Sequence, residues 1–340
     1  MSMPAVLTVQ NLRVEIPTRR GLLLALDDIS FHIAPGEILG FVGESGAGKS
    51  LTGMAILGLL DPPGRVAGGE IRLGERRIDR LSQREMRKVR GKEIGAVFQD
   101  PLMSLNPLLQ IGDQLVETVR THLPVSHDEA VQRALGLMRA VGIPAPEARF
   151  TAYPHQFSGG MRQRIVIALA LCAEPRLVVA DEPTTALDVS IQAQVLQLLR
   201  QLCREKGTSM LLVTHDMGVI AETADRVAVM YAGRIVEIGR VEDVIRHPVH
   251  PYTRGLMGAI PTLAPVTGPL AQIDGAMPRL NARPVGCAFN PRCPHATAQC
   301  RAESPPVVTY GDRQVACWLA PAFLDAGAAR MAAAELEVCP

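Results

Sequence analysis

Short apolar runs alternate with helix-like segments over the first two-thirds of the chain. Three runs are almost wholly apolar: Glu37–Gly43, Leu177–Ala180 and Met210–Thr214. Such runs are typical of parallel strands that are covered on both faces. Arg226–Ile238 predicts two strands around Ala232-Gly233, an antiparallel hairpin at an edge of the sheet. The alternation over residues 1 to about 240 predicts an α/β fold with a parallel sheet.

Two segments depart from this alternation. The strand pattern disappears between Asp100 and Tyr153, and Asp128–Val141 is clearly helical, so we expect a helical insertion over about 100–165. From about Pro248 the chain is rich in proline and cysteine and has little periodicity. We therefore expect a core domain over residues 1–245 and a C-terminal extension over 246–340, with a terminal helix in the Ala-rich stretch Gly327–Glu335.

The composition narrows the location and the partners. The longest apolar run, Ile165–Ala173, is far shorter than the roughly 18 to 20 residues of a membrane span, and no export signal begins the sequence. We expect an intracellular protein whose seven cysteines form no disulfides. A net charge of +1 and an aromatic content of 4% supply neither a polybasic field nor stacking platforms, so no nucleic-acid partner is expected.

A glycine-rich loop with the spacing G-x-x-x-x-G-K-[ST] lies between the first apolar run and a helix-compatible stretch, 50–60. In this context the backbone N–H groups of the loop and the start of the helix converge on phosphate oxygens. Lys49 then supplies a positive charge to the β- and γ-phosphates, and Ser50 supplies a hydroxyl to Mg²⁺. The residues predicted to surround the phosphates are Gly43, Glu44, Ser45, Gly46, Ala47, Gly48, Lys49 and Ser50.

Two carboxylates follow the apolar run 177–180. Asp181 and Glu182 stand at the end of a predicted strand, where open α/β sheets bind their ligands. We expect Asp181 to bind Mg²⁺, directly or through water. Glu182 is the predicted general base that polarises the attacking water.

Four further features follow the phosphate loop in a fixed order. Gln99 comes first, and Ser158–Met161 then begins a second helix-compatible stretch. Ser158 is a natural N-cap, and the two glycines after it allow an anion to approach the backbone. Asp188 ends an Ala-Leu-Asp segment, and His215 follows the apolar run 210–214.

This order of motifs resembles that of the ATP-binding-cassette (ABC) ATPases, over residues 5 to about 245. The resemblance implies a P-loop NTPase cassette: a RecA-like core, an antiparallel β subdomain and a helical insertion. It implies ATP and Mg²⁺ as cofactors, with Ser50, Gln99 and Asp181 around the metal. It also implies that two cassettes enclose two ATP molecules, so that Ser158, Gly159 and Gly160 contact nucleotide held by a partner. The catalytic residues that it implies are Gln99, Glu182 and His215.

A narrower resemblance is to the ATPase subunits of dipeptide and oligopeptide importers. It is carried by PHQFSGGMRQRIVIALAL (154–171), by HPYTRGLM (250–257) and by GCAFNPRCPHATAQC and VACWL in the extension. It implies a peripheral protein on the cytoplasmic face of the cell (inner) membrane that hydrolyses ATP to power peptide import. The implied partners are a second, non-identical ABC ATPase, two membrane permeases and an extracytoplasmic substrate-binding protein.

Other functions stay open beside this one. A related importer for nickel or glutathione has a similar ATPase, and a soluble ABC ATPase acting on nucleic acid could also carry a metal-binding tail. The near-zero charge and the HPYTR segment count against the nucleic-acid function. An ATPase for drug or toxin export is a weaker alternative, because such proteins often carry fused membrane spans.

Two positions depart from the common family pattern. Phe157 and Met161 replace the ends of the usual LSGGQ signature, and Met161 removes an amide that could reach ribose or phosphate. Leu12–Pro17 holds no aromatic residue to stack on adenine, and Ile16 stands in that place. We therefore assign no residue to the base.

The extension concentrates cysteines. Cys287, Cys293, Cys300 and Cys317 have five, six and sixteen residues between them. Four thiols in a loop-rich intracellular segment indicate a metal site, because such a segment has little apolar material for its own core. The spacing itself matches neither ferredoxin patterns nor paired C-x₂-C zinc ligands. The family resemblance favours a structural [4Fe–4S] cluster; zinc, or free thiols in a docked tail, are the alternatives.

Overall fold

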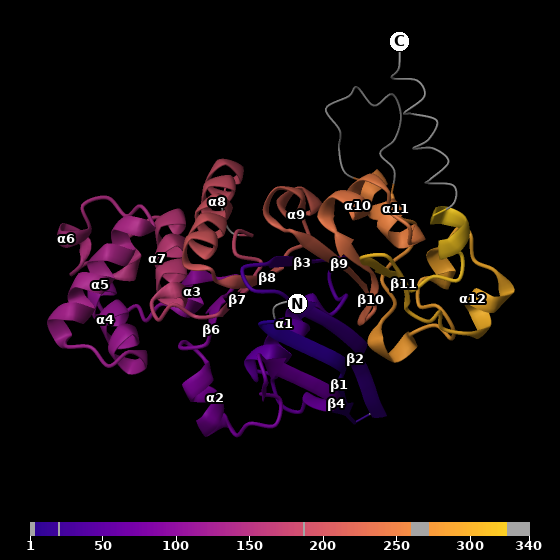
Figure 1. Ribbon diagram of the computed structural model, residues 1–340, viewed down its shortest axis with the longest axis horizontal. Coiled ribbons are helices and arrows are strands. Elements are labelled where there is room, and N and C mark those ends of the chain that lie inside the picture. Colours follow the sequence, from indigo (N-terminus) through magenta and orange to yellow (C-terminus); the bar gives the residue numbers. More distant parts are fainter. Residues whose placement is uncertain (1–3, 20, 186–187, 260–271, 325–340) are drawn as a thin grey trace, which may run out of the picture.

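The computed structural model of the protein describes residues 4–19, 21–185, 188–259 and 272–324. The predicted Ala-rich terminal helix and Cys339 lie outside these residues. The molecule is elongated, with the helices α4–α6 at one end and the C-terminal extension around α12 at the other (Figure 1). Between them lies a core sheet, and a second sheet lies along one side of it.

The core sheet has eight strands in the order β11-β12-β10-β9-β3-β8-β7-β6. Five neighbouring strands, from β9 to β6, run parallel, as the apolar runs predict. Every residue of β3 and of β8 is buried, because helices or the second sheet cover both faces. The parallel strands are β3 (Ile38–Val42), β6 (Ile94–Val97), β7 (Leu177–Asp181), β8 (Ser209–Val213) and β9 (Arg226–Tyr231).

The second sheet is antiparallel, with the order β2-β1-β4-β5. Its long strands turn apolar side chains inward, and with α1 (Lys49–Leu57) they form one of the two large apolar clusters. α2 (Gln83–Val89) connects this sheet to β6. The antiparallel β subdomain that the family resemblance implies is therefore present. Its strands are β1 (Leu7–Thr18), β2 (Gly21–Ile33), β4 (Arg65–Leu73) and β5 (Arg76–Arg77).

Helices form the other large apolar cluster, on the opposite face of the core sheet. α7 (Gly159–Leu171), α8 (Val189–Lys206) and α9 (Met217–Thr223) pack on the sheet. Where the sequence predicts a helical insertion, the described residues from Asp100 to Tyr153 contain helices and turns but no strand. Its elements, followed by the 3₁₀ turn that precedes α7, are α3 (Pro101–Ser104), α4 (Ile111–His122), α5 (His127–Ala140), α6 (Pro146–Arg149) and η1 (Pro154–Gln156).

The predicted hairpin is present as β9 and β10 (Arg234–Arg240), but its placement at a sheet edge is wrong. β12 (Arg313–Val315) pairs with β10, and β11 (Val308–Tyr310) forms the edge. Two strands of the extension are therefore part of the core sheet, so the extension is not a structurally separate unit. Its helices are α10 (Val241–Arg246), α11 (Pro251–Gly258), η2 (Leu280–Ala282), η3 (Asn290–Arg292) and α12 (Ala298–Ala302).

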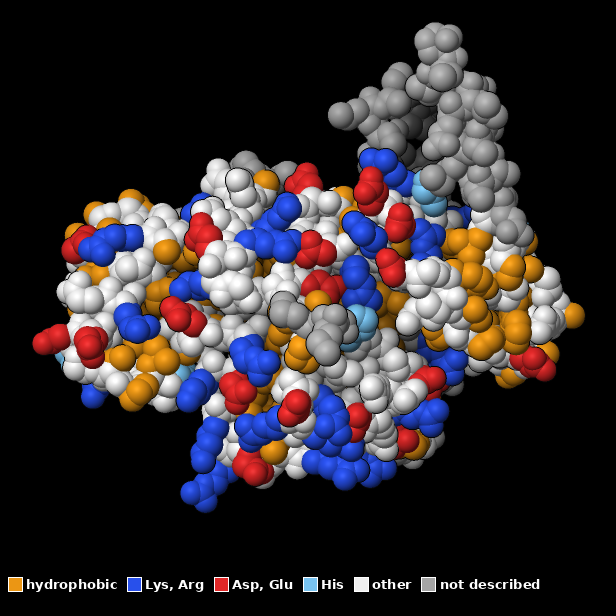
Figure 2. Space-filling model, viewed as in Figure 1, with side chains coloured by type: hydrophobic (Ala, Val, Ile, Leu, Met, Phe, Trp, Pro, Cys, Tyr) orange, Lys and Arg blue, Asp and Glu red, His pale blue; other side chains and the backbone are white. Residues whose placement is uncertain are grey.

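A buried carboxylate joins the extension to β10. Glu237 is fully buried and accepts hydrogen bonds from the backbone N–H groups of Val249 (3.0 Å) and His250 (2.9 Å). Arg313 on β12 approaches the same carboxylate at 3.5 Å. Because a buried charge without partners is costly, these contacts fix the path of the chain after β10. Figure 2 shows hydrophobic side chains gathered over this end of the molecule.

Candidate functional site

The phosphate loop, residues 43–48, connects β3 to α1 at the carboxyl edge of the parallel strands. Gly43 has a φ of +152°, and a Cβ there would lie 2.3 Å from the carbonyl oxygen of Met230, so only glycine fits. Lys49 is 5% exposed, and its Nζ donates to the carbonyl oxygens of Gly43 (2.8 Å) and Glu44 (3.1 Å). These hydrogen bonds connect the Lys49 side chain to the first two residues of the loop.

The loop meets the two carboxylates at the end of β7. The Ser50 hydroxyl donates to Oδ1 of Asp181 over 2.8 Å, so two of the three predicted magnesium ligands are neighbours. Burial lowers the pKa of Lys49, while the charges of Glu182, Asp181 and Glu44 oppose that effect. Lys49 and these three carboxylates therefore lie close enough to influence one another.

Glu182 is the centre of a small hydrogen-bond network. Its Oε2 accepts from the Thr185 hydroxyl (2.7 Å) and from Nε2 of Gln99 (3.3 Å), and its Oε1 lies 3.2 Å from Nδ1 of His215. The backbone φ of Glu182 is +45°, in the left-handed region. This conformation costs energy in any residue other than glycine and is often found at functional positions. The structure thus brings together Gln99, Glu182 and His215, which are 83 and 33 residues apart in sequence.

The surroundings shift the pKa values of the two carboxylates in opposite directions. Burial, with the nearby charge of Glu182, raises the pKa of Asp181 in spite of the Ser50 hydrogen bond and the Lys49 charge. Burial also acts to raise the pKa of Glu182, but its hydrogen bonds with Thr185 and His215 and the charges of His215 and Lys49 outweigh this and lower it. Glu182 is therefore held ionised, the state in which a carboxylate can accept a proton.

The predicted signature residues stand at the start of α7. Ser158 is the N-cap, and its hydroxyl accepts from the backbone N–H of Met161 over 3.4 Å. A Cβ at Gly160 would lie 2.7 Å from Ile191 on α8, which explains a glycine there by packing alone. Within the described residues, no hydrogen bond or ion pair connects Ser158–Gly160 to the phosphate loop. Asp188 lies just before α8, and its neighbours 186–187 are outside the described residues.

The sequence analysis missed two residues that hold the phosphate loop from the extension. The Tyr252 hydroxyl accepts from the backbone N–H of Glu44 over 2.9 Å. Nη1 of Arg292 donates to both carboxylate oxygens of Glu44, over 2.9 and 3.1 Å, and its side chain is only 7% exposed. Tyr252 lies in the HPYTR segment, so the sequence marked it without giving it a role. Arg292 lies in the GCAFNPRC part of the extension, which the sequence also marked without giving this residue a role.

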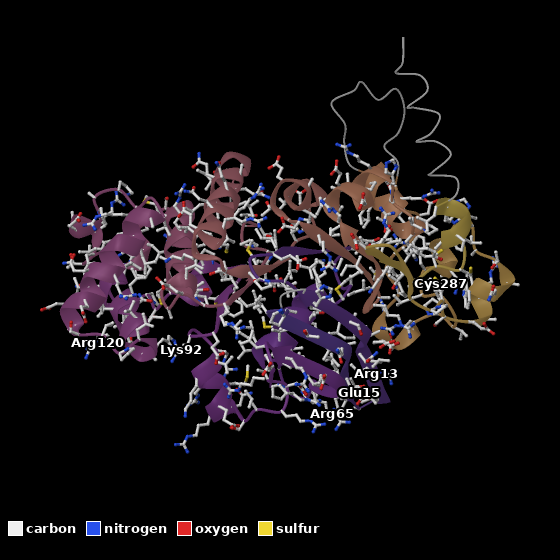
Figure 3. The ribbon with its side chains drawn as sticks, in the orientation of Figure 1. Arg13, Glu15, Arg65, Lys92, Arg120 and Cys287 are labelled. Carbon is white, nitrogen blue, oxygen red and sulfur yellow. The ribbon has the colours of Figure 1, made fainter. Side chains whose placement is uncertain are left out.

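Four of the five cysteines of the extension line one small cavity. Cys287 (Figure 3), Cys293, Cys300 and Cys317 surround a volume of about 10 Å³, close to the minimum that one water needs. Burial raises the pKa of Cys287, of Cys293 and of Cys317, the last to about 11.

The predicted iron–sulfur cluster or zinc site is not supported by this arrangement. The described residues contain no group of three or more His, Cys, Asp or Glu side chains placed to hold a metal ion. The four thiols line one cavity, but its volume of about 10 Å³ corresponds to about one water.

No helix in the described ranges has both the length and the apolar character of a membrane span.

Two family models match the chain. The ABC transporter model matches residues 26–185, which include the phosphate loop and both carboxylates. The model of the C-terminal region of oligopeptide and dipeptide transporters matches residues 236–300.

Solved structures share the fold. The dimeric ATP-binding cassette MJ0796, in a post-hydrolysis state with ADP and phosphate, superposes with a TM-score of 0.62 at 28% identity, over 69% of this chain and 98% of that one. cbiO1 from Clostridium perfringens, part of an ABC transporter complex, gives a TM-score of 0.62 at 27% identity, over 72% and 92% of the two chains.

Curated relatives are similar over nearly the whole chain. The dipeptide transport ATP-binding protein DppD of Bacillus subtilis is 48% identical over 319 residues, which are 93% of this chain and 95% of the relative. The oligopeptide transport ATP-binding protein OppD of Salmonella typhimurium is 46% identical over 304 residues, 89% and 90% of the two chains. Together with the geometry of the phosphate loop and its carboxylates, these similarities show that the chain belongs to the family of ATP-binding subunits of dipeptide and oligopeptide ABC transporters.

Proposed function

We propose that this chain hydrolyses ATP to power the import of dipeptides or oligopeptides through a membrane transporter. The observation that carries the proposal is the meeting of Lys49, Ser50, Asp181 and Glu182 at the carboxyl edge of one sheet. The relatives named as dipeptide and oligopeptide transport proteins supply the substrate class.

The proposed chemistry assigns one task to each side chain. Lys49 and the loop N–H groups neutralise and orient the triphosphate. Ser50, Asp181 and Gln99 offer oxygen atoms of the kind that Mg²⁺ prefers, and that ion, when bound, would neutralise phosphate charge. Glu182 accepts a proton from the attacking water, while His215 and Thr185 hold its carboxylate in place through the contacts described above.

The proposed active unit contains two cassettes. Ser158 and Gly159 are exposed at the start of α7 and, among the described residues, have no hydrogen bond or ion pair with this chain's own phosphate loop. A helix N-terminus with free N–H groups attracts phosphate, so these residues can contact ATP held by a partner. The dimeric MJ0796 structure supports the arrangement. We further propose that the partner is a non-identical ABC ATPase, as the importer resemblance implies.

An exposed apolar surface follows Gln99 and fits a permease. Leu102, Met103 and Leu108 are 56%, 86% and 82% exposed, in the segment between Gln99 and α4. Several large apolar side chains exposed within one short segment are a candidate interaction surface. Because Gln99 contacts Glu182, a permease bound here would be connected directly to the hydrolysis site. The chain would then lie peripherally on the cytoplasmic face of the membrane, with a substrate-binding protein on the other side.

A reconstituted transporter tests the proposal. The chain, its partner ATPase and two permeases in proteoliposomes should hydrolyse ATP faster when a peptide-loaded binding protein is added, and Lys49→Ala should abolish this activity. Met103→Gln with Leu108→Gln should remove the stimulation, whereas Leu22→Gln, at a 54% exposed position on β2, should not. Hydrolysis without any peptide uptake would refute the importer function.

We also propose that the four cysteines bind a metal, as a [4Fe–4S] cluster or as zinc. The convergence of four thiols on one cavity supports the proposal, and the small volume of that cavity opposes it. Anaerobic purification followed by iron, sulfide and zinc analysis tests it. If the analysis finds clearly less than about one metal site per chain and the protein has no visible absorbance, the four cysteines are free thiols.

A further inference from the structure

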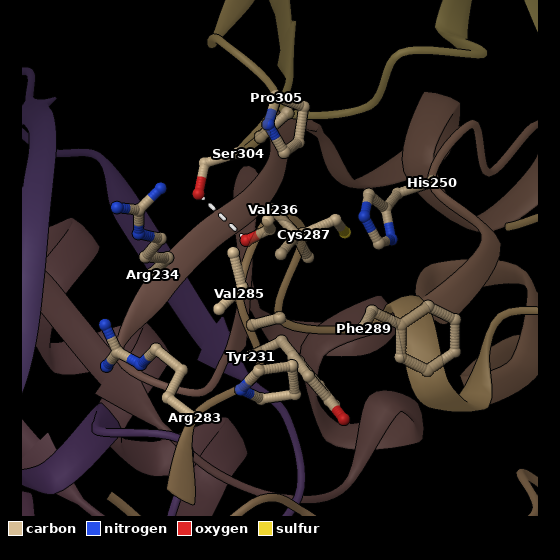
Figure 4. Close-up of a pocket in the computed structure, with 14 residues that line it drawn as sticks. Tyr231, Arg234, Val236, His250, Arg283, Val285, Cys287, Phe289, Ser304 and Pro305 are labelled. Carbon is tan, nitrogen blue, oxygen red and sulfur yellow. Dashed lines mark hydrogen bonds between the residues drawn. The ribbon is translucent and has the colours of Figure 1, made fainter. Parts of the chain in front are cut away.

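A pocket of about 260 Å³ lies between the β9–β10 hairpin and part of the extension. One wall comes from Tyr231 and Val236 of the hairpin, and the other from Val285, Phe289 and Pro305 of the extension (Figure 4). An engineered cavity of about 150 Å³ is large enough to hold benzene, so this pocket has room for a ring and a small polar group. None of the residues that line it belongs to the phosphate loop; Tyr231 of the pocket lies 3.5 Å from Arg292, which in turn binds Glu44.

One side of the pocket carries an excess of positive charge. Arg234 and Arg283 lie together on that side, opposite His250 and Phe289 (Figure 4). Both arginines pair with Asp27 of β2: Nε of Arg234 at 2.9 Å and Nη1 of Arg283 at 3.4 Å.

The exposed Arg13 (Figure 3) also approaches Asp27, at 3.6 Å. Three guanidinium groups thus share one carboxylate. In the described part of the chain, neither Arg234 nor Arg283 has an ion pair with a second carboxylate.

The other titratable groups of the pocket carry no compensating negative charge. Burial lowers the pKa of His250 to about 3, and its Nδ1 already accepts the backbone N–H of Tyr252, so the ring is neutral. Burial raises the pKa of the Tyr231 hydroxyl, which stays protonated. The Ser304 hydroxyl donates to the carbonyl oxygen of Gly286. The pocket is therefore apolar at one end and cationic at the other.

We propose that this pocket binds a small organic carboxylate with an aromatic or branched apolar body. The carboxylate would lie against Arg234 and Arg283, because a guanidinium group matches a carboxylate in shape and charge and binds it through paired hydrogen bonds. The apolar body would lie against Phe289, Tyr231 and Val236, where aromatic edges favour a ring. A bound carboxylate would also balance the positive charge that Asp27 leaves over.

Calorimetric titration of the full chain with phenylacetate tests the proposal, with phenylacetamide as the neutral probe of the same shape. Val285→Trp is the blocking variant, since Val285 lines the pocket and is 76% exposed, so a larger side chain there fills the opening without disturbing the core. Arg234→Gln removes one guanidinium group. Arg120→Gln, an exposed arginine of α4 at the other end of the molecule (Figure 3), is the matched control.

Phenylacetate should bind at least about tenfold more tightly than phenylacetamide, and Val285→Trp and Arg234→Gln should each weaken it by at least about tenfold. Arg120→Gln should have no effect. Equal binding of acid and amide, unchanged binding in Val285→Trp, or no heat of binding with phenylacetate would each overturn the proposal. The titration needs neither ATP nor a partner, so a negative result leaves the proposed ATPase function untouched.

Discussion

Replacing Arg292 by glutamine tests whether the extension holds the phosphate loop in its binding shape. In the protein, Nη1 of Arg292 lies 2.9 and 3.1 Å from the two oxygens of Glu44, and the arginine is almost completely buried. The variant leaves the Glu44 carboxylate without its partner, beside the place where the triphosphate binds. An unpaired negative charge there repels ATP and loosens the loop.

The structure sets the size of the effect. A hydrogen bond to a charged group contributes about 1.5–3 kcal/mol when buried. Because the Glu44 side chain is 30% exposed, solvent screens part of this, and we expect a loss of about 1–2 kcal/mol, or roughly 5- to 30-fold in ATP affinity. The value of kcat should change much less, since Glu182, Gln99 and His215 are not touched by the substitution.

The assay is ATP hydrolysis by the assembled transporter over a range of ATP concentrations, with nucleotide binding measured separately. Adding Glu44→Gln to Arg292→Gln should restore most of the affinity, because it removes the unpaired charge. Arg301→Gln, an exposed arginine of α12 in the same extension, should leave KM unchanged. A KM for ATP that is unchanged in Arg292→Gln, or a double variant no better than the single one, would refute the reasoning.

Three further predictions concern the same end of the sheet and the extension. Glu182→Gln should slow hydrolysis by about 10²–10⁴-fold while ATP stays bound, and full turnover in that variant would remove Glu182 from its role. Tyr252→Phe leaves the Glu44 N–H without its acceptor and should cost about 0.5–1.5 kcal/mol in urea unfolding and raise KM for ATP; an unaltered KM would show that the contact is only structural. Burial lowers the pKa of His250 to about 3, so below pH 6.5 the unfolded chain takes up a proton that the folded chain does not, and stability should fall as the pH drops from 6.5 toward 3. His250→Asn keeps a side-chain acceptor for the Tyr252 N–H. In unfolding measurements this variant should lower the slope of the unfolding free energy against pH by up to about 1.4 kcal/mol per pH unit. An equal slope in both proteins would contradict the prediction.

The local sequence determined the parallel core and the residues of the hydrolysis site. β3, β7 and β8 are covered on both faces, so their sequences are continuous apolar runs that need no tertiary knowledge to recognise. Phosphate chemistry likewise needs a short loop with glycines and a lysine before a helix, and eight successive residues, 43–50, display it. The order of the later motifs then indicated Gln99, Glu182 and His215.

Only the tertiary structure decided how the extension meets the core. β11 and β12 have three residues each, too few for a periodic pattern that the sequence could show. The sequence therefore predicted the β9–β10 hairpin at the edge of the sheet, whereas β12 pairs with β10 there. Tyr252 and Arg292 contact Glu44 across 208 and 248 residues, and four thiols that are up to 30 residues apart in the sequence line one cavity. Contacts of this kind depend on how distant segments pack, and packing leaves no regular spacing in the chain.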